Sequence, residues 1–157
     1  MIILGIDPGT AITGWGVVKH TQGVQDFINA GVVNTPTNED LPKRLATIYE
    51  DITSLLEQFK PQAVALEKLF FNTNAKTALS VGHSRGVVIL AIEQKGIPLF
   101  EYTPLQVKTA VTGYGRAEKK QMQEMVKRLL NLKTIPRPDD AADALSIAIT
   151  HCVSIHF

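Results

Sequence analysis

The sequence predicts an α/β fold, in which a five-stranded mixed sheet is flanked by helices within a single domain of residues 1–157. Three β-type segments come first and are joined by short turns, which is typical of an antiparallel meander. Helical and strand-like segments then alternate, as they do in sheets that are covered by helices. A chain of 157 residues is long enough to fold around its own core.

The first three strands follow from apolar runs and turn signals. Residues 2–6 are continuously apolar, as a buried central strand is, and Asp7-Pro8-Gly9 ends the run. Residues 15–19 and 24–33 indicate two more strands, with a turn between them at residues 21–23.

The rest of the chain alternates between helix and strand. Pro42 opens a helix whose apolar residues keep helical spacing to Phe59, and Pro61 stops it. A short strand at residues 63–66 ends at Glu67, and a fifth strand is expected at residues 97–102. Further helices are expected at residues 75–94, 104–112, 118–131 and from 139 to about 154.

The composition excludes several classes of protein. The single cysteine, Cys152, cannot form an internal disulfide, so the chain is not a disulfide scaffold. No apolar run reaches the roughly 18 residues that span a membrane. The first residues lack the basic segment of a signal peptide. We therefore expect a soluble, cytoplasmic protein with no membrane partner.

The net charge of +1 conceals a basic segment. Residues 103–137 hold eight basic and two acidic residues, a local charge of +6, and the rest of the chain carries −5. A block of this kind favours a polyanionic partner, although a solvated helix face would have the same composition. Lys108, Lys119 and Lys120 belong to this segment.

Four carboxylates stand where the predicted fold brings distant segments together. Asp7 ends the first strand, Glu67 ends the fourth, and Asp140 and Asp143 share one face of the last helix. Converging carboxylates cannot all stay ionised without a positive charge among them. The simplest source is a pair of hard divalent cations, Mg²⁺ or Mn²⁺, with Asp7 as the bridging ligand.

Two divalent ions about 3.5–4 Å apart would clamp the attacking and leaving oxygens of a phosphodiester. Each acid also has a structural alternative, because Asp7 could be a turn residue, Glu67 an exposed strand end and Asp140 a helix cap. Glu67 and Asp143 have apolar neighbours, where an unpaired carboxylate is costly, and this favours the metal site. The sequence shows no Walker loop, nucleophile elbow or zinc-ligand spacing.

Taken together, the motifs resemble those of the bacterial RuvC Holliday-junction resolvases, in order and over nearly the whole chain. They comprise residues 3–9 with 13–16, residues 65–67 with Phe70, residues 82–86, residues 117–119 and residues 140–151. The resemblance implies an RNase H-like fold and a homodimer that cuts four-way DNA junctions symmetrically, leaving 5′-phosphate and 3′-hydroxyl ends. It also implies work beside the branch-migration motor made of RuvA and RuvB.

The resemblance also assigns the functional residues. The catalytic and metal-binding acids map onto Asp7, Glu67, Asp140 and Asp143. The junction-contacting residues map onto Phe70, Lys108 and Lys119, and we expect the neighbouring Lys120 to bind phosphate with them. Phe70 would stack on an unpaired base, whereas Phe71 is expected to anchor the core. Asp139 adds an acid before the family pattern, and the Asp-x-x-Asp spacing favours Asp140.

The helix at residues 75–94 leaves one question open. Small and apolar residues, Gly82 and Gly86 among them, recur on one side of it. Small residues permit close packing either against the sheet or against a second subunit, and spacing alone does not choose. A two-fold dimer suits a task that needs two cuts.

Other functions fit parts of the sequence. An actin-like ATPase would need a second domain, for which 157 residues leave no room, and a DEDD exonuclease would need an acid where Gly9 stands. A non-catalytic DNA-binding module would explain the lysines but not the converging acids. YqgF-type resolvases are the enzymes most easily confused with this chain, and residues 82–86 together with the Asp140/Asp143 spacing favour RuvC.

Overall fold

The computed structural model describes residues 1–69 and 75–155 and contains one five-stranded sheet, in the order β3-β2-β1-β4-β5. β1 pairs antiparallel with β2, and β2 with β3, whereas β4 and β5 run parallel to β1. This confirms the predicted mixed sheet that follows an antiparallel meander. The strands are β1 (Ile2–Asp7), β2 (Ile12–Thr21), β3 (Val24–Asn34), β4 (Ala63–Glu67) and β5 (Leu99–Tyr102).

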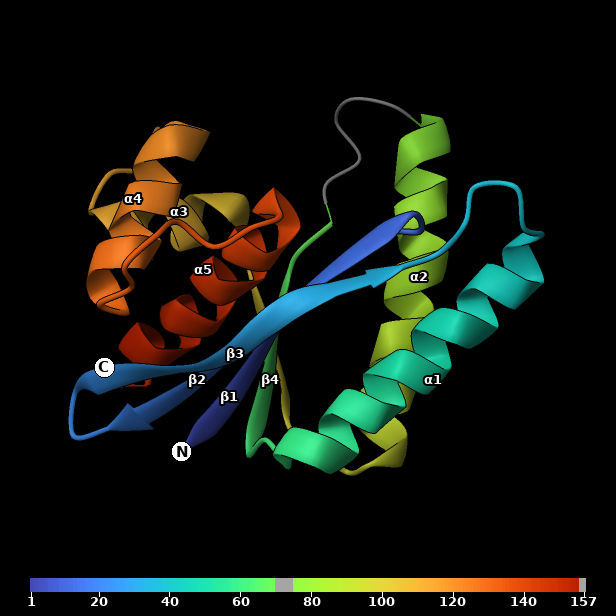
Figure 1. Ribbon diagram of the computed structural model, residues 1–157, viewed down its shortest axis with the longest axis horizontal. Coiled ribbons are helices and arrows are strands. Elements are labelled where there is room, and N and C mark those ends of the chain that lie inside the picture. The colour runs from blue at the N-terminus through green and yellow to red at the C-terminus, as the bar shows by residue number, and fades with distance from the viewer. Residues whose placement is uncertain (70–74, 156–157) are drawn as a thin grey trace.

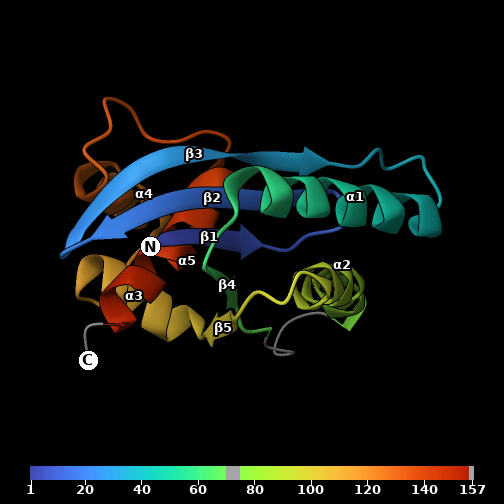
Figure 2. The same cartoon turned by 90° about the horizontal axis from the view of Figure 1, so that it is seen from below.

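Helices cover both faces of the sheet (Figures 1 and 2). On one face lie α1 (Leu41–Phe59) and α2 (Ala75–Gln94), and on the other lie α3 (Pro104–Thr112), α4 (Lys119–Leu129) and α5 (Asp139–Ser154). Among the described residues, no helix is long and apolar enough to cross a membrane.

Alternation along the central strand assigns its side chains to two separate cores. Leu4 and Ile6 belong to the core under α1 and α2, whereas Ile3 belongs to the core under α3, α4 and α5. Successive side chains of a strand point to opposite faces. Asp7, four residues after Ile3, therefore lies on the α5 side.

Glycines let α5 lie unusually close to the sheet. A Cβ added at Gly5 would stand 2.1 Å from the carbonyl oxygen of Ala144, and one at Gly14 would stand 2.1 Å from the carbonyl oxygen of Asp140. Real side chains never approach a backbone oxygen so closely, so larger residues at these positions would displace the helix. The glycines thus determine how near the first turns of α5 come to the end of β1.

The predicted elements are all present, with shifts at their ends. β2 begins at Ile12 rather than at residue 15, because Ile12 and Thr13 pair with β3 and Gly14 pairs with both neighbours. β5 begins at Leu99 rather than at residue 97.

The packing face of α2 differs from the predicted stripe. Its buried residues are Ala78, Ser84, Val88, Ala91 and Ile92, so the sheet-facing side includes a serine. Gly82 and Gly86 have nothing within 4 Å of an added Cβ, and they therefore face open space rather than the sheet. The physical reason is that α2 packs through Val88 and Ile92 against the same core as α1.

Candidate active site

Asp7 and Glu67 end two neighbouring parallel strands. Ile6 of β1 pairs with Leu66 of β4, so the two acids follow paired residues at the same edge of the sheet. Glu67 is in register with Tyr102 of β5, which belongs to the core under α5. Both carboxylates therefore lie on the α5 side of the sheet, as the predicted convergence of the acids requires.

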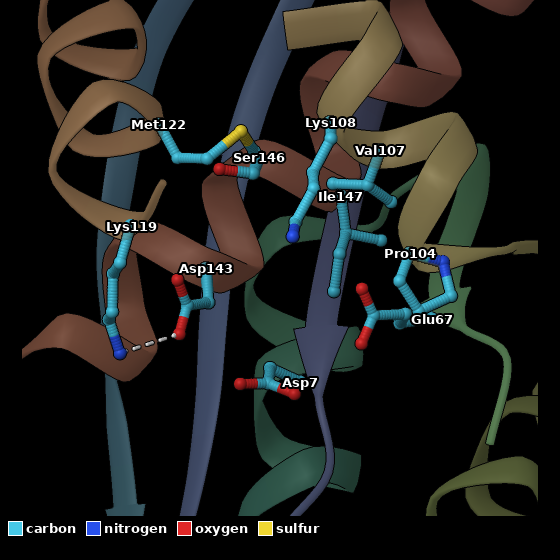
Figure 3. A pocket seen from close by; sticks show the side chains of 10 residues that line it. All are labelled: Asp7, Glu67, Pro104, Val107, Lys108, Lys119, Met122, Asp143, Ser146 and Ile147. Atoms are coloured by element: carbon cyan, nitrogen blue, oxygen red, sulfur yellow. Dashed lines mark ion pairs between the residues drawn. The ribbon is translucent and has the colours of Figure 1, made fainter. Parts of the chain in front are cut away.

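Asp7 and Glu67 line a cleft of about 320 Å³, which lies between the sheet edge and α3, α4 and α5 (Figure 3). Asp143 reaches the cleft from α5, Lys108 from α3 and Lys119 from α4. The remaining wall is mostly apolar and consists of Pro104, Val107, Met122, Ser146 and Ile147. Three of the predicted acids and two of the predicted lysines thus share one cleft.

Burial and mutual repulsion change how the acids ionise. Burial raises the pKa of Asp7 to about 7, and the negative charges of Asp143, Glu67 and Asp140 add to the rise. The pKa of Glu67 is also raised, by burial and by Asp143. Lys108 opposes the rise at Glu67, and Lys119 opposes it at Asp7. In the absence of a further cation, the cluster therefore holds a proton near neutral pH.

Lys119 pairs with two acids of α5. Its Nζ lies 3.3 Å from Oδ2 of Asp143 and 3.5 Å from Oδ2 of Asp139. Burial lowers the pKa of Lys119, but the charges of Asp143 and Asp139 outweigh burial and raise it overall. The pKa of Asp143 stays raised, because burial has a larger effect than the charge of Lys119.

The adjacent acids Asp139 and Asp140 have different surroundings. Asp139 forms ion pairs with Arg137 and with Lys119, outside the cleft. Asp140 acts electrostatically on both Asp7 and Asp143, and its backbone packs against Gly14 beside the end of β1. Asp140 also borders a second hollow, which is lined by residues of α1 and α2.

The cluster fits a hard divalent cation by its chemistry. All four acids offer carboxylate oxygens, the ligands that Mg²⁺ and Mn²⁺ prefer. The repulsion that raises the pKa of Asp7 is what a cation among the acids would remove. Within the part of the chain that the structure describes, no three such side chains already enclose a cation site. Asp7, Glu67 and Asp143 line the cleft, and Asp140 borders the adjacent hollow.

The other residues predicted to contact DNA either lie outside the cleft of Asp7 or fall outside the described residues. Lys120 lines a separate hollow with Tyr114, Glu124 and Arg128, and so does not share the cleft with its neighbour Lys119. Phe70 and Phe71 lie outside the described residues. His83 is exposed, and buried His151 hydrogen-bonds through Nδ1 to the Tyr102 hydroxyl at 2.7 Å.

One contact at the site was not predicted. Nη1 of Arg85, on α2, donates a 3.0 Å hydrogen bond to the backbone carbonyl of Glu67, and Nη2 pairs with the Glu101 carboxylate. Arg85 thus holds the end of β4 from the face opposite the cleft. The available signal was a charged residue inside the largely apolar second half of α2.

Comparison with known proteins assigns the family. The family model for crossover junction endodeoxyribonuclease RuvC matches residues 3–151. The RuvC protein of Rubrobacter xylanophilus is 54% identical over 153 residues, which are 98% of this chain and 86% of that protein.

Solved structures agree with this assignment. Thermus thermophilus RuvC superposes with a TM-score of 0.92 at 37% identity, and the same protein in complex with a Holliday junction substrate with 0.91 at 35%. Both matches cover 99% of this chain and 96% of the other, which confirms the expected RNase H-like fold. The chain therefore belongs to the RuvC family of crossover junction endodeoxyribonucleases.

Proposed function

We propose that this chain resolves four-way (Holliday) DNA junctions by paired symmetric nicks that leave 5′-phosphate and 3′-hydroxyl ends. Residues 1–157 would act as one nuclease domain in DNA recombination and repair. Membership of the RuvC family implies that hydrolysis depends on a divalent metal. The proposed cofactor is a pair of Mg²⁺ ions per active site, which Mn²⁺ can replace.

Asp7, Glu67, Asp140 and Asp143 are the proposed metal ligands and catalytic acids. The negative charges of all three other acids raise the pKa of Asp7, which is therefore the natural shared ligand. When bound, the ions would supply positive charge to the attacking and leaving oxygens of the phosphodiester. The acids fix where that charge sits, and the apolar wall formed by Val107, Met122 and Ile147 limits water around it.

Lys108 and Lys119 are proposed to hold phosphates on either side of the cut. Both reach the cleft of Asp7 from different helices, so they are placed to meet one strand at two points. Lys120 faces another hollow, and its proposed contact is with a more distant part of the junction. The proposed stacking of Phe70 on an unpaired base concerns a residue outside the described ranges.

A homodimer is proposed because two symmetric cuts need two active sites. The exposed side of α2 supports it. Gly82 and Gly86 face open space, and Leu79 and Leu90, which lie on the same side, are 63% and 51% exposed. This face fits a second subunit better than the sheet. We further propose that the dimer works in the cytoplasm beside the RuvA and RuvB branch-migration motor.

The observation that carries the proposal is the cleft that combines Asp7, Glu67 and Asp143 with Lys108 and Lys119. The direct test is cleavage of a synthetic mobile four-way junction in Mg²⁺, by the wild type and by Asp7→Asn. Linear duplex of the same sequence is the substrate control. We expect paired, religatable nicks in the junction only, and an Asp7→Asn protein that binds the junction without cutting it.

Two outcomes would contradict the proposal. Equal cutting of linear duplex would indicate a nuclease without junction selectivity. Binding without any cutting by the wild type, in Mg²⁺ or Mn²⁺, would indicate a DNA-binding module or an enzyme that requires another protein.

A further inference from the structure

A second polar hollow lies across the end of β1 from the acid cleft. It has a volume of about 510 Å³ and is bordered by residues 9–12, Arg44, Lys76, Thr77, Ser80 and Asp140. Arg44 comes from the first turn of α1, and Lys76, Thr77 and Ser80 come from the first turns of α2. The acid cleft is instead bordered by α3, α4 and α5, which cover the other face of the sheet (Figures 1 and 2).

The side chain of Arg44 is fixed in the wall of this hollow. Its Nε donates a 2.9 Å hydrogen bond to Oγ1 of Thr35, a residue that is 5% exposed. Oγ1 of Thr35 in turn donates to the carbonyl of Thr10. Within the described residues, no hydrogen bond or ion pair uses Nη1 or Nη2 of Arg44. The planar end of the guanidinium is therefore positioned, with its donors available to a ligand.

Hydroxyl groups tie the rest of the wall together. Oγ1 of Thr10 donates to the Ser80 carbonyl at 2.8 Å, and it lies 2.6 Å from Oγ of Ser80 and 2.9 Å from Oγ of Ser84. These bonds join the loop after β1 to α2, while Thr35 joins the same loop to α1. The hollow is thus built by three segments that hold one another in place.

Asp140 connects this hollow with the acid cluster. It borders the hollow, and its charge acts on Asp7 in the cleft. A DNA strand whose scissile phosphate lies among the acids meets Lys108 and Lys119 on one side. The hollow bordered by Arg44 and Lys76 lies beside the same acids, next to Asp140.

We propose that Arg44, with Lys76, binds a backbone phosphate of the cleaved DNA strand on the side of the acids opposite Lys108 and Lys119. A guanidinium binds the oxygens of a phosphate through paired donors, and the fixed Nε leaves Nη1 and Nη2 for that purpose. This subsite rests on the proposed function, because it assumes that DNA occupies the acid cleft.

The test measures binding alone, so that it is independent of cutting. Kd for a labelled four-way junction is measured without divalent metal at several salt concentrations, for the wild type, Arg44→Gln and Lys43→Gln. Lys43 is the matched control, because it is the exposed neighbour of Arg44 and does not border the hollow. We expect Arg44→Gln to weaken binding about fivefold and to reduce the salt slope by about 0.9, as the loss of one phosphate contact does.

Neutral phosphates then locate the contact. Junctions that carry one methylphosphonate at each position near the cut are bound to the wild type and to Arg44→Gln. At one position beside the cut, a neutral phosphate should weaken junction binding by the wild type but leave junction binding by Arg44→Gln unchanged. Thr35→Val keeps the charge of Arg44 but removes its anchor and the bond to the Thr10 carbonyl. Measured at a temperature at which it is fully folded, it should lose part of the same affinity.

Two results would overturn the subsite. Equal binding by Arg44→Gln and Lys43→Gln would remove the role of Arg44. Arg44→Gln could also bind more weakly while each methylphosphonate reduces its affinity as much as it reduces that of the wild type. That result would show that Arg44 touches no phosphate near the cut. Failure of the proposed function would appear separately, as absence of junction cutting by the wild type.

Discussion

Nζ of Lys119 lies 3.3 Å from Oδ2 of Asp143, so a residue expected to bind DNA is paired with one expected to bind metal. The lysine supplies positive charge to the acid cluster from the side of α4 (Figure 3). A bound cation and Lys119 would therefore compete for the same carboxylate. Metal binding would release the lysine toward a phosphate.

The first prediction concerns this competition. Lys119→Met should bind Mn²⁺ about threefold more tightly than the wild type, because an exposed ion pair contributes up to about 1 kcal/mol. The same variant should bind junctions more weakly. Lys120→Met is the matched control, since its side chain borders a different hollow. Titration followed by electron paramagnetic resonance measures the Mn²⁺ affinity, and identical values for the two variants would contradict the competition.

The second prediction concerns the two lysines of the cleft. The double variant Lys108→Ala/Lys119→Ala should bind junctions more weakly and lower the salt slope by about 1.8, the value for two lost duplex phosphate contacts. Fluorescence anisotropy over a range of salt concentrations gives the slope. Lys133→Ala, an exposed lysine outside the cleft, is the control. An unchanged slope in the double variant would remove the phosphate-binding assignment.

The third prediction follows from the raised pKa of Asp7. Its value is about 7 in the folded protein against an ordinary value of 3.8, so the folded state binds more protons between these pH values. The contribution of Asp7 to stability therefore falls as pH rises from about 4 to 7 and stays low above that range. The full loss amounts to at most about 4 kcal/mol.

Urea unfolding of the metal-free protein at pH 5 and pH 8 tests this dependence. Asp7→Asn should be more stable than the wild type at pH 8, and the difference should shrink at pH 5. Asp51→Asn, which removes an exposed acid of α1, is the control and should change little at either pH. If Asp7→Asn gained no stability at pH 8, burial and the neighbouring acids would not be destabilising the ionised carboxylate of Asp7.

The fourth prediction concerns Arg85 as a positioning residue for Glu67. Arg85→Met should lower kcat for junction cutting by at least about tenfold, because small displacements of a catalytic group are costly. Kd for the junction should stay unchanged, and the Mg²⁺ concentration at half-maximal rate should rise.

Lys95→Met is the matched control for Arg85. Lys95 directly follows the last residue of α2, ten residues beyond Arg85, and pairs with Glu57 at 2.6 Å. Breaking that pair should leave both kcat and the Mg²⁺ midpoint unchanged. A merely structural role of Arg85 would lower the unfolding midpoint of Arg85→Met without shifting its Mg²⁺ requirement.

Much of the acid cleft could be predicted because it depends on local patterns. Asp7 and Glu67 each follow a short apolar run, and parallel strands that are neighbours bring their carboxyl ends to one edge. Asp140 and Asp143 share a helix face through their spacing. What the pattern could not give was the closeness of α5, which depends on Gly5 and Gly14 meeting backbone atoms more than a hundred residues away.

Neighbours in sequence also diverged in space. Lys119 and Lys120 are adjacent residues of the same type. Successive helical residues point about 100° apart, however, and only Lys119 reaches the cleft. Asp140 and Asp143 share a face, yet only Asp143 borders the cleft. The reason is that α5 begins over Gly14 of β2, so its first turn, with Asp140, lies beside the second hollow. Arg85 could not be placed at all, since its partners are a backbone carbonyl and a residue of another strand.

The sequence by itself determined the order of the elements, the mixed sheet and the identity of the acids, because each follows from periodicity, turn residues and motif spacing along the chain. Only the tertiary structure decided which lysine faces the acids, which side of α2 stays open and how Arg44 and Arg85 are held. Those outcomes depend on contacts between segments far apart in sequence, and such contacts leave no periodic signal in the residues that make them.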